Sequence, residues 1–355
     1  MKGCARVPVR VDPAGGGTDA PPYCLDHGGA VVNLAVQRHA FAMVQQLDEG
    51  AGVALYAMDI NKGKSVLSIE QLSETKDLEF LGAFVERLAP SGDSLLLVTE
   101  TDVPAGSGLG GSGALGVAVV AALDQLYGRE RTPAETAALA NEIERQDLGY
   151  PGGDQDSYGA ALGGINYLKY QPGGGMTRHR IKINEPTCRA LEYQSLLIYT
   201  GEGHVSATIH EDIRTSYALP NSPTLHAMQI LHAQADKMAA ALPEGDLKAY
   251  GEALSESCRQ LYRLHESCDS AEHRRYFEAI DDCIMGGKTC GAGGGGFLLV
   301  LTKPGHRREC IGRIEQLGGT VWPVVIDWQG LATWVEPPWD EAEVRRLRDL
   351  AAVNS

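Results

Sequence analysis

Apolar positions in the first half of the chain alternate with polar ones in some stretches and recur at helical spacing in others. AVVNLAVQRHAFAMVQQL, residues 30–47, is β-rich and partly alternating, and SLLLVTETDVP, residues 94–104, has the pattern of a buried strand. GALGVAVVAALDQLYG, residues 113–128, is an apolar helical segment that follows a glycine-rich turn. Pro133 near a helix start and apolar residues at helical spacing predict a second helix over 133–148.

The pattern changes near residue 190. Two long helical patterns follow within residues 224–266, and the PEGD turn at 243–246 separates them. The other predicted elements are a strand at 193–201, a buried strand at 296–304, a helix at 305–318 and terminal strands within 319–335. This mixture of strands and helices predicts the α+β class, with one unit at residues 1–189 and a second at 190–355.

Composition narrows the classes of function. The 355 residues are 43% hydrophobic, enough for two cores that share an interface. Lys and Arg number 31 against 46 Asp and Glu, a net charge of -15, which argues against a nucleic-acid partner. The chain has no 18-residue apolar run and no signal-peptide pattern at its start, so we expect a cytoplasmic protein without a membrane partner.

The cysteine pattern indicates neither a disulfide framework nor a metal centre. The eight cysteines form no C-x-x-C pair and no compact framework, so they are expected to be reduced thiols. No paired Cys/His cluster at zinc-site spacing occurs, and a structural metal is therefore not indicated.

Many of the 43 glycines gather in clusters at 15–17, 106–113 and 286–296, with a smaller one at 152–164. In VPAGSGLGGSGALGVAVVAAL, residues 103–123, the glycines join a predicted strand to a helix. Such a loop leaves backbone N–H groups uncovered at a helix N-terminus, where the partial positive charge favours phosphate. No Lys followed by Ser or Thr closes the loop, so it is not a Walker A motif. A flexible turn is the alternative interpretation.

Three of these segments together resemble the motifs of one kinase superfamily. PAGSGLGGSGA resembles its second motif, RVPVRVDPAGGGTDAPPY its first motif in the sugar-kinase branch, and KTCGAGGGGFLLVL its third. The chain is therefore similar to the GHMP kinases, named for galactokinase, homoserine kinase, mevalonate kinase and phosphomevalonate kinase. The resemblance implies an N-terminal ATP-binding domain with a left-handed β-α-β crossover and a ferredoxin-like C-terminal domain.

The resemblance assigns the nucleotide and metal positions. Within the family, the Ser of the second motif and a Glu on the next helix hold Mg²⁺ against the phosphates of ATP, which here implies Ser112 and Glu144. A solvated surface carboxylate is the alternative for Glu144. The residues expected to surround the ATP phosphates are Pro104, Gly106, Ser107, Gly108, Leu109, Gly110, Gly111, Ser112 and Gly113.

The turn GGDQDSYGAALGGINYL, residues 152–168, carries the candidate catalytic residue. The resemblance places Asp156 against the acceptor hydroxyl, whose proton a carboxylate can take, and Arg10 as its cationic partner. Ordinary turn chemistry is the alternative for an Asp in such a segment. Asp19 matches the acid that sugar kinases use to bind ring hydroxyls, although Thr18 and Asp19 are also typical of a capped turn. The full set expected to bind substrate is Gly17, Thr18, Asp19, Gly153, Gly293 and Gly294.

The pattern of the heptose 7-phosphate kinases and fucokinase-like enzymes is the most similar one within the family. The expected reaction is therefore phosphorylation of the anomeric hydroxyl of a heptose 7-phosphate or related sugar. Those heptose kinases tend to have basic residues where this chain has Asp154 and His204, which makes a neutral sugar an alternative acceptor. A catalytically silent sugar-binding regulator is a third hypothesis, and a decarboxylase on the same fold a fourth. A homodimer is compatible with the sequence but does not follow from it.

Overall fold

A computed structural model of the chain describes residues 1–74, 76, 78–201, 206–220 and 222–353. Two β-sheets form its framework, one with eight strands and one with four. The larger sheet has the order β12-β1-β2-β5-β3-β4, and β6 pairs with β2 and β7. Its strands are β1 (Lys2–Ala14), β2 (Gly29–Gln46), β3 (Val53–Ala57), β4 (Lys62–Val66), β5 (Leu95–Thr101), β6 (Ile165–Tyr170), β7 (Met176–Arg180) and β12 (Ala332–Glu336).

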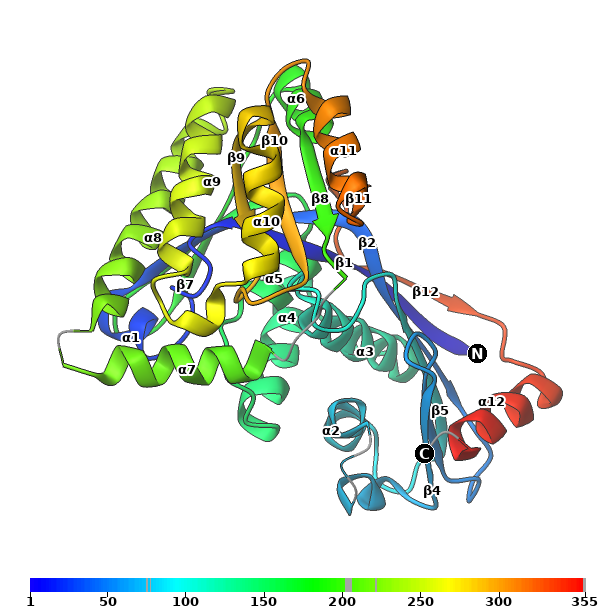
Figure 1. The fold of residues 1–355 in the computed structure, drawn as a ribbon. Coiled ribbons are helices and arrows are strands. Elements are labelled where there is room, and N and C mark those ends of the chain that lie inside the picture. Colours follow the sequence, from blue (N-terminus) through cyan, green and yellow to red (C-terminus); the bar gives the residue numbers. More distant parts are fainter. Residues whose placement is uncertain (75, 77, 202–205, 221, 354–355) are drawn as a thin grey trace.

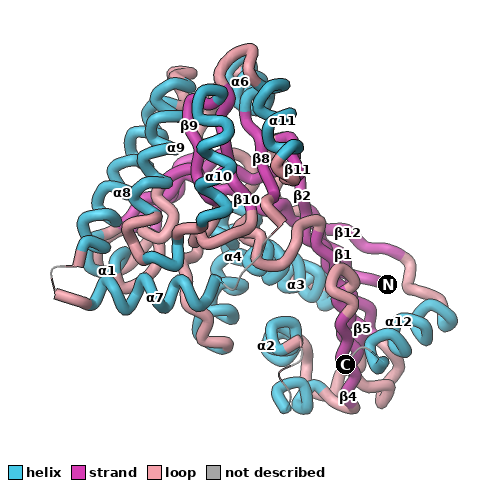
Figure 2. Tube along the Cα trace, in the orientation of Figure 1, coloured by secondary structure: helices cyan, strands magenta, loops and turns pink. Residues whose placement is uncertain are grey.

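The smaller sheet is antiparallel throughout and has the order β11-β8-β10-β9. Its strands are β8 (Ser195–Tyr199), β9 (Ile284–Thr289), β10 (Phe297–Thr302) and β11 (Thr320–Pro323). Both sheets combine with helices, and this confirms the predicted α+β class. Figure 2 shows the strands of the two sheets running through the molecule, with helices around them.

Helices cover the two sheets and link them. The α-helices are α1 (Tyr23–His27), α2 (Glu79–Leu88), α3 (Gly111–Tyr127), α4 (Pro133–Glu142), α5 (Gln155–Leu162), α6 (Glu185–Gln194), α7 (Ser206–Ala218), α8 (Pro223–Ala241), α9 (Leu247–Leu261), α10 (Ala271–Ile280), α11 (Arg307–Gln316) and α12 (Glu341–Val353). Shorter helical turns are η1 (Ile69–Glu74), η2 (Ile143–Asp147), η3 (Glu266–Cys268) and η4 (Asp281–Cys283). Helix α3 packs on β1 and β2, and α9 contacts both β1 and β9 (Figure 1).

One continuous hydrophobic core joins the larger sheet, α3 and the inner face of the smaller sheet. It contains fully buried residues from β1, α3 and β10, such as Val9, Val117 and Phe297. Helices α10 and α11 cover the other face of the smaller sheet around a separate cluster. Because one core spans both sheets, the segments that come from each can hold a shared site in a fixed geometry.

The terminal segment of the chain lies with the larger sheet. Strand β12 pairs antiparallel with β1, and α12 packs against β3 and β4 (Figure 1). The sequence division placed residues 190–355 in one unit, but in the structure only part of that range surrounds the smaller sheet. A strand that pairs with the N-terminus cannot be distinguished by its own sequence from one that pairs locally.

All eight cysteines are free thiols, and each except Cys188 is buried. Among the residues that the structure describes, no helix has the length and apolar character needed to cross a membrane.

Candidate active site

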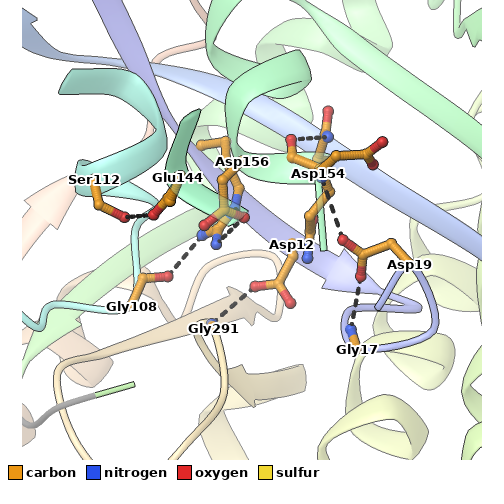
Figure 3. A network of polar contacts seen from close by, with 12 residues as sticks. Asp12, Gly17, Asp19, Gly108, Ser112, Glu144, Asp154, Asp156 and Gly291 are labelled. Carbon is orange, nitrogen blue, oxygen red and sulfur yellow. Dashed lines mark hydrogen bonds and ion pairs between the residues drawn. The ribbon is translucent and has the colours of Figure 1, made fainter. Parts of the chain in front are cut away.

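A cavity of about 860 Å³ lies where β1, the start of α3, η2, α5, α7 and the loop after β9 meet. Most of the residues predicted from the motifs line it. They are Arg10, Gly17, Asp19, Pro104, Gly106, Ser107, Gly108, Gly110, Gly111, Ser112, Glu144, Gly153 and Asp156. Figure 3 shows Ser112 and Glu144 on one side of this group, Asp19 and Gly17 on the other, and Asp156 and Asp12 between them.

Arg10 and Asp156 are directly paired, although 146 residues separate them in the sequence. The Arg10 Nε and Nη2 atoms donate to Oδ1 of Asp156 at 2.8 and 2.5 Å. Arg10 is almost fully buried, whereas the side chain of Asp156 keeps 31% of its surface exposed. The neighbouring carboxylates raise the pKa of Arg10 against the opposing effect of its burial. One partner is therefore a fixed cation and the other a carboxylate that remains open to the cavity.

The close approach of α3 and α5 positions this pair. Arg10 comes from β1, and Asp156 lies in the first turn of α5. A Cβ at Gly113 would lie 2.6 Å from Cβ of Asp156, so glycine is needed for the two helices to come this close. Gly113 itself is buried between the helices and does not line the cavity.

The glycine loop before α3 opens its backbone toward the cavity. Gly106, Gly108 and Gly110 all have positive φ, between 69° and 78°, which only glycine adopts without strain. Arg10 holds the loop through a 2.7 Å hydrogen bond from Nη1 to the Gly108 carbonyl, while its own backbone N–H donates to the carbonyl of Leu109 at 3.0 Å. The side chain of Leu109 points into the core and is fully buried. The loop is thus a rigid support whose N–H groups and helix N-terminus favour an anion.

Ser112 and Glu144 lie side by side at the edge of this loop. The Ser112 Oγ donates to Oε1 of Glu144 at 3.0 Å. Burial, together with the nearby charge of Asp156, raises the pKa of Glu144 from 4.5 to about 7. The helix that carries it continues from α4 into the single π-turn η2. Glu144 is therefore a half-buried carboxylate beside a hydroxyl.

Asp19 occupies the opposite end of the cavity. It is 3% exposed, and its two carboxylate oxygens accept from the backbone N–H of Gly17 at 3.1 Å and of Gln155 at 3.2 Å. Burial and the charges of Asp154 and Asp156 raise its pKa to about 7. A Cβ at Gly153 would lie 1.7 Å from Oδ2 of Asp19, so the carboxylate fits only because this position is glycine.

Three residues expected to bind substrate do not line the cavity. The fully buried Thr18 hydroxyl accepts from the N–H of Ala30 and donates to the Gly15 carbonyl, so it holds the backbone of the first glycine cluster. Gly293 and Gly294 pack against the backbone carbonyl of Cys268, to which Gly294 donates at 2.8 Å. In the third cluster it is Gly291 and Ala292 that reach the cavity.

The structure adds a buried ion pair that the motifs did not indicate. Lys288 Nζ donates to Oδ2 of Asp12 at 3.0 Å, and both side chains are at most 2% exposed. The other oxygen of Asp12 accepts from the N–H of Gly291 at 2.9 Å. Asp12 thereby ties the third glycine cluster to β1. The only sequence signals were an Asp between two motif residues and a Lys at the start of the third motif.

Other residues that line the cavity were also not predicted from the sequence. Gln155, 6% exposed, lies between Asp154 and Asp156, and its Oε1 has no hydrogen-bond partner among the described residues. Another part of the cavity is mostly apolar, with Asp59 and Thr101 as its polar lining residues. Its apolar lining residues are Ala57, Ile60, Leu78, Phe80, Leu81 and Val103.

In the sequence, Asp154 and His204 were the two positions that suggested a neutral sugar, and the structure describes only the first of them. Asp154 lines neither this cavity nor a smaller depression beside it, and its carboxylate accepts a hydrogen bond from the hydroxyl of Tyr170. His204 lies outside the residues that the structure describes.

Comparisons with known proteins identify the family of the chain. Residues 78–164 match the family described as GHMP kinases N terminal domain, and residues 238–318 match GHMP kinases C terminal. The chain is 30% identical over 334 residues to the D-glycero-alpha-D-manno-heptose 7-phosphate kinase of Campylobacter jejuni, covering 93% of this chain and 98% of that protein. It is 28% identical to the L-fucokinase/L-fucose-1-P guanylyltransferase of Bacteroides fragilis over 84% of this chain and 34% of that protein.

Solved structures show the same fold. A D-glycero-D-manno-heptose 1-phosphate kinase from Bacteroides thetaiotaomicron superposes with a TM-score of 0.79 at 26% identity, covering 95% of this chain and all of that one. The galactokinase of Lactococcus lactis, solved with galactose, has a TM-score of 0.73 at 16% identity over 94% of this chain and 95% of that one.

Proposed function

The chain belongs to the GHMP kinase family and is a sugar kinase, and from this premise we propose that it phosphorylates the anomeric hydroxyl of a heptose 7-phosphate or closely related sugar with ATP. The observation that carries the proposal is the Arg10–Asp156 pair, which lies between the glycine loop and Asp19. A phosphate donor and a polyhydroxylated acceptor bound at these two ends would meet at Asp156.

The proposed reaction is an in-line phosphoryl transfer. The acceptor hydroxyl attacks the γ-phosphorus, its proton passes to Asp156, and the bond from that phosphorus to the bridging oxygen breaks to release ADP. Arg10 orients Asp156, because it donates two hydrogen bonds to one carboxylate oxygen. The fixed guanidinium also offsets negative charge that develops on the transferred group.

The glycine loop and the N-terminus of α3 support binding of the ATP phosphates. The loop N–H groups are preorganised, because Arg10 holds two of its backbone carbonyls. The mostly apolar part of the cavity, with Ile60, Leu78 and Phe80 among its residues, is suited to a flat base such as adenine.

The chemistry of Ser112 and Glu144 fits Mg²⁺. A hydroxyl and a carboxylate are oxygen ligands of the kind that Mg²⁺ prefers, and Ser112 and Glu144 lie within hydrogen-bond distance of each other. Bound beside the phosphates, the ion would neutralise part of their charge. In this proposal Ser112 and Glu144 orient it toward the glycine loop.

Asp19 supports a sugar as the acceptor. Its two oxygens are fixed by backbone N–H groups and can accept further hydrogen bonds from vicinal hydroxyls. Asp154 does not argue against a sugar phosphate, because its carboxylate is bonded to Tyr170 and does not line the cavity. The silent-regulator hypothesis loses support, since Arg10, Asp156 and Ser112 are all present and in contact with their partners.

An ADP-coupled assay with a heptose 7-phosphate, the unphosphorylated heptose, fucose and galactose tests the proposal, with the product position assigned by NMR. We expect the heptose 7-phosphate to give the highest kcat/KM and a product phosphorylated at the anomeric oxygen. Turnover restricted to fucose or galactose would contradict the proposed acceptor and show that the protein is a neutral-sugar kinase. Absence of Mg²⁺-dependent ADP formation with every sugar would favour a regulator.

A further inference from the structure

A second depression of about 280 Å³ adjoins the acceptor end of the main cavity. The two share several lining residues, so that a bound molecule can extend from one into the other. The shared residues are Gly17, Arg145, Tyr150, Pro151, Gly152, His210 and Ile213. Gly17 donates a hydrogen bond to Asp19, and Gly152 precedes Gly153, which packs against the same carboxylate, so the depression adjoins Asp19.

The electrostatic character reverses between these adjoining spaces. The acceptor end of the main cavity is acidic and contains Asp12, Asp19 and Asp156. The depression is lined by Arg145 and Arg214, and Glu211 is the only carboxylate among its described lining residues. Two arginines from separate elements, η2 and α7, therefore line the same small space.

The guanidinium groups of Arg145 and Arg214 differ in their hydrogen bonds and ion pairs. Arg145 is half-buried, and its charge interacts with the nearby carboxylates of Glu144 and Asp154, although no hydrogen bond or ion pair joins its guanidinium to another described residue. Arg214 is held by Glu211 through Nε at 3.0 Å and Nη2 at 2.7 Å, which leaves Nη1 available. Arg214 is 60% exposed, and phosphate is an oxyanion that an arginine guanidinium binds well through paired hydrogen bonds.

His210 lies between the two spaces and adds a polar ring instead of a charge. Its burial lowers the pKa of the imidazole, so at neutral pH the ring is uncharged and can donate one hydrogen bond. The positive charge of the depression therefore comes from its two arginines.

We propose that Arg145 and Arg214 form a subsite for the distal phosphate of the acceptor sugar. The inference rests on the proposed function, and it deepens that function by assigning residues to recognition of the sugar phosphate. An acceptor whose reacting hydroxyl meets Asp156 and whose ring contacts Asp19 would extend its far end into the depression. The two arginines would supply the positive charge that the related heptose kinases tend to have at the positions of Asp154 and His204.

The test compares a heptose 7-phosphate with the same heptose lacking phosphate in Arg145→Ala and Arg214→Ala variants. Each variant should lower the kcat/KM ratio of phosphorylated to unphosphorylated sugar by about tenfold or more, the scale of a lost charge-assisted hydrogen bond. Arg189→Ala on α6 is the matched control, because Arg189 is a surface arginine paired with Glu185, and it should leave the ratio unchanged. Calorimetric titration of the wild type and both variants with the sugar phosphate measures the same subsite without turnover.

The outcomes separate the subsite from the reaction. An unchanged kcat/KM ratio and unchanged binding of the sugar phosphate in both variants would overturn the subsite while leaving the kinase assignment intact. Wild-type protein that turns over neither heptose would overturn the proposed acceptor, and calorimetry then decides the subsite alone. A variant that loses turnover of both sugars equally indicates damage to the shared site, which also contradicts a role confined to the phosphate.

Discussion

Arg10 links two parts of the proposed active site, the catalytic carboxylate and the glycine loop. It donates to Asp156 and to the Gly108 carbonyl, so one guanidinium orients both the carboxylate and the glycine loop. Removing either partner of the pair therefore changes more than one interaction. At the scale of single residues, this coupling makes non-additive effects the expected result.

Asp156→Asn keeps the size of the side chain but removes its charge and its capacity to take a proton. We expect turnover to fall by about a hundredfold or more with ATP affinity little altered. Arg10→Ala should cause a similar loss, and the double variant should be far less impaired than the product of the two losses. Melting temperatures of the same preparations serve as the control. An Asp156→Asn protein that has a lowered melting temperature but near-normal turnover would show that the role of Asp156 is structural and not catalytic.

Asp19 provides a prediction in pH. Its pKa is raised from 3.8 to about 7, so its carboxylate is fully ionised only above that value. Because the ionised form accepts two hydroxyl hydrogen bonds, kcat/KM for the sugar should rise as pH increases through about 7. In Asp19→Asn this rise should become smaller while KM for the sugar increases, and the part that remains comes from Glu144, whose pKa is also raised to about 7. A wild-type profile that is flat between pH 6 and 8 would contradict ionisation of Asp19 in sugar binding.

The raised pKa of Asp19 also makes the stability of the folded protein depend on pH, and in the opposite direction to sugar binding. The folded protein binds this proton more tightly than the unfolded chain, so the stability it contributes is present below about 3.8 and is lost as pH rises to about 7. Thermal unfolding of wild type and Asp19→Asn without ligands measures this part of the pH dependence as the difference between the two curves.

At the scale of elements, the contact between α3 and α5 determines whether the two ends of the site align. Gly113 on α3 faces Asp156 on α5, and the turn before α5 brings Gly153 against Asp19. The glycines that matter most here are those whose missing Cβ makes room for a catalytic side chain.

Gly113→Ala should place a methyl group 2.6 Å from Cβ of Asp156 and push α5 away from α3. We expect kcat to fall by at least tenfold, since small displacements of a catalytic group are costly. The control is Gly312→Ala on α11, where no atom lies within 4 Å of the added Cβ. That variant should gain about 0.5–1 kcal/mol of stability from helix propensity and keep its kcat. Normal kcat in Gly113→Ala would show that the helices accommodate the methyl group.

At the scale of the whole molecule, the Asp12–Lys288 pair connects strands of the two sheets across 276 residues of sequence. Both charges are buried, so removal of one leaves the other without a partner. Replacing both together removes the penalty of a lone buried charge.

Asp12→Asn and Lys288→Met should each cost about 3–5 kcal/mol in free energy of unfolding, measured with denaturant. The double variant should be less destabilised than the sum of the two. Additive losses in the double variant would show that the two charges do not depend on each other. Asp12→Asn should also lower turnover, because its carboxylate holds Gly291 beside the cavity.

Local features of the sequence determined the elements and the centre of the site. The strand pattern at 30–47 is confirmed by β2, that at 94–104 by β5, and the helix after the glycine loop by α3. These predictions succeed because periodicity and the need for glycine at positive φ are properties of a few consecutive residues. The ordered motifs also indicated Arg10 and Asp156, which the structure brings into contact.

Tertiary structure alone decided which distant residues complete the site. Nothing in the sequence near Asp12 indicates that Lys288 is its partner, and nothing near Arg145 indicates that Arg214 lines the same depression. The pairing of β12 with β1 is another such contact. Each depends on packing between segments far apart in the chain, and the burial that shifts the pKa of Asp19 arises only when those segments enclose it.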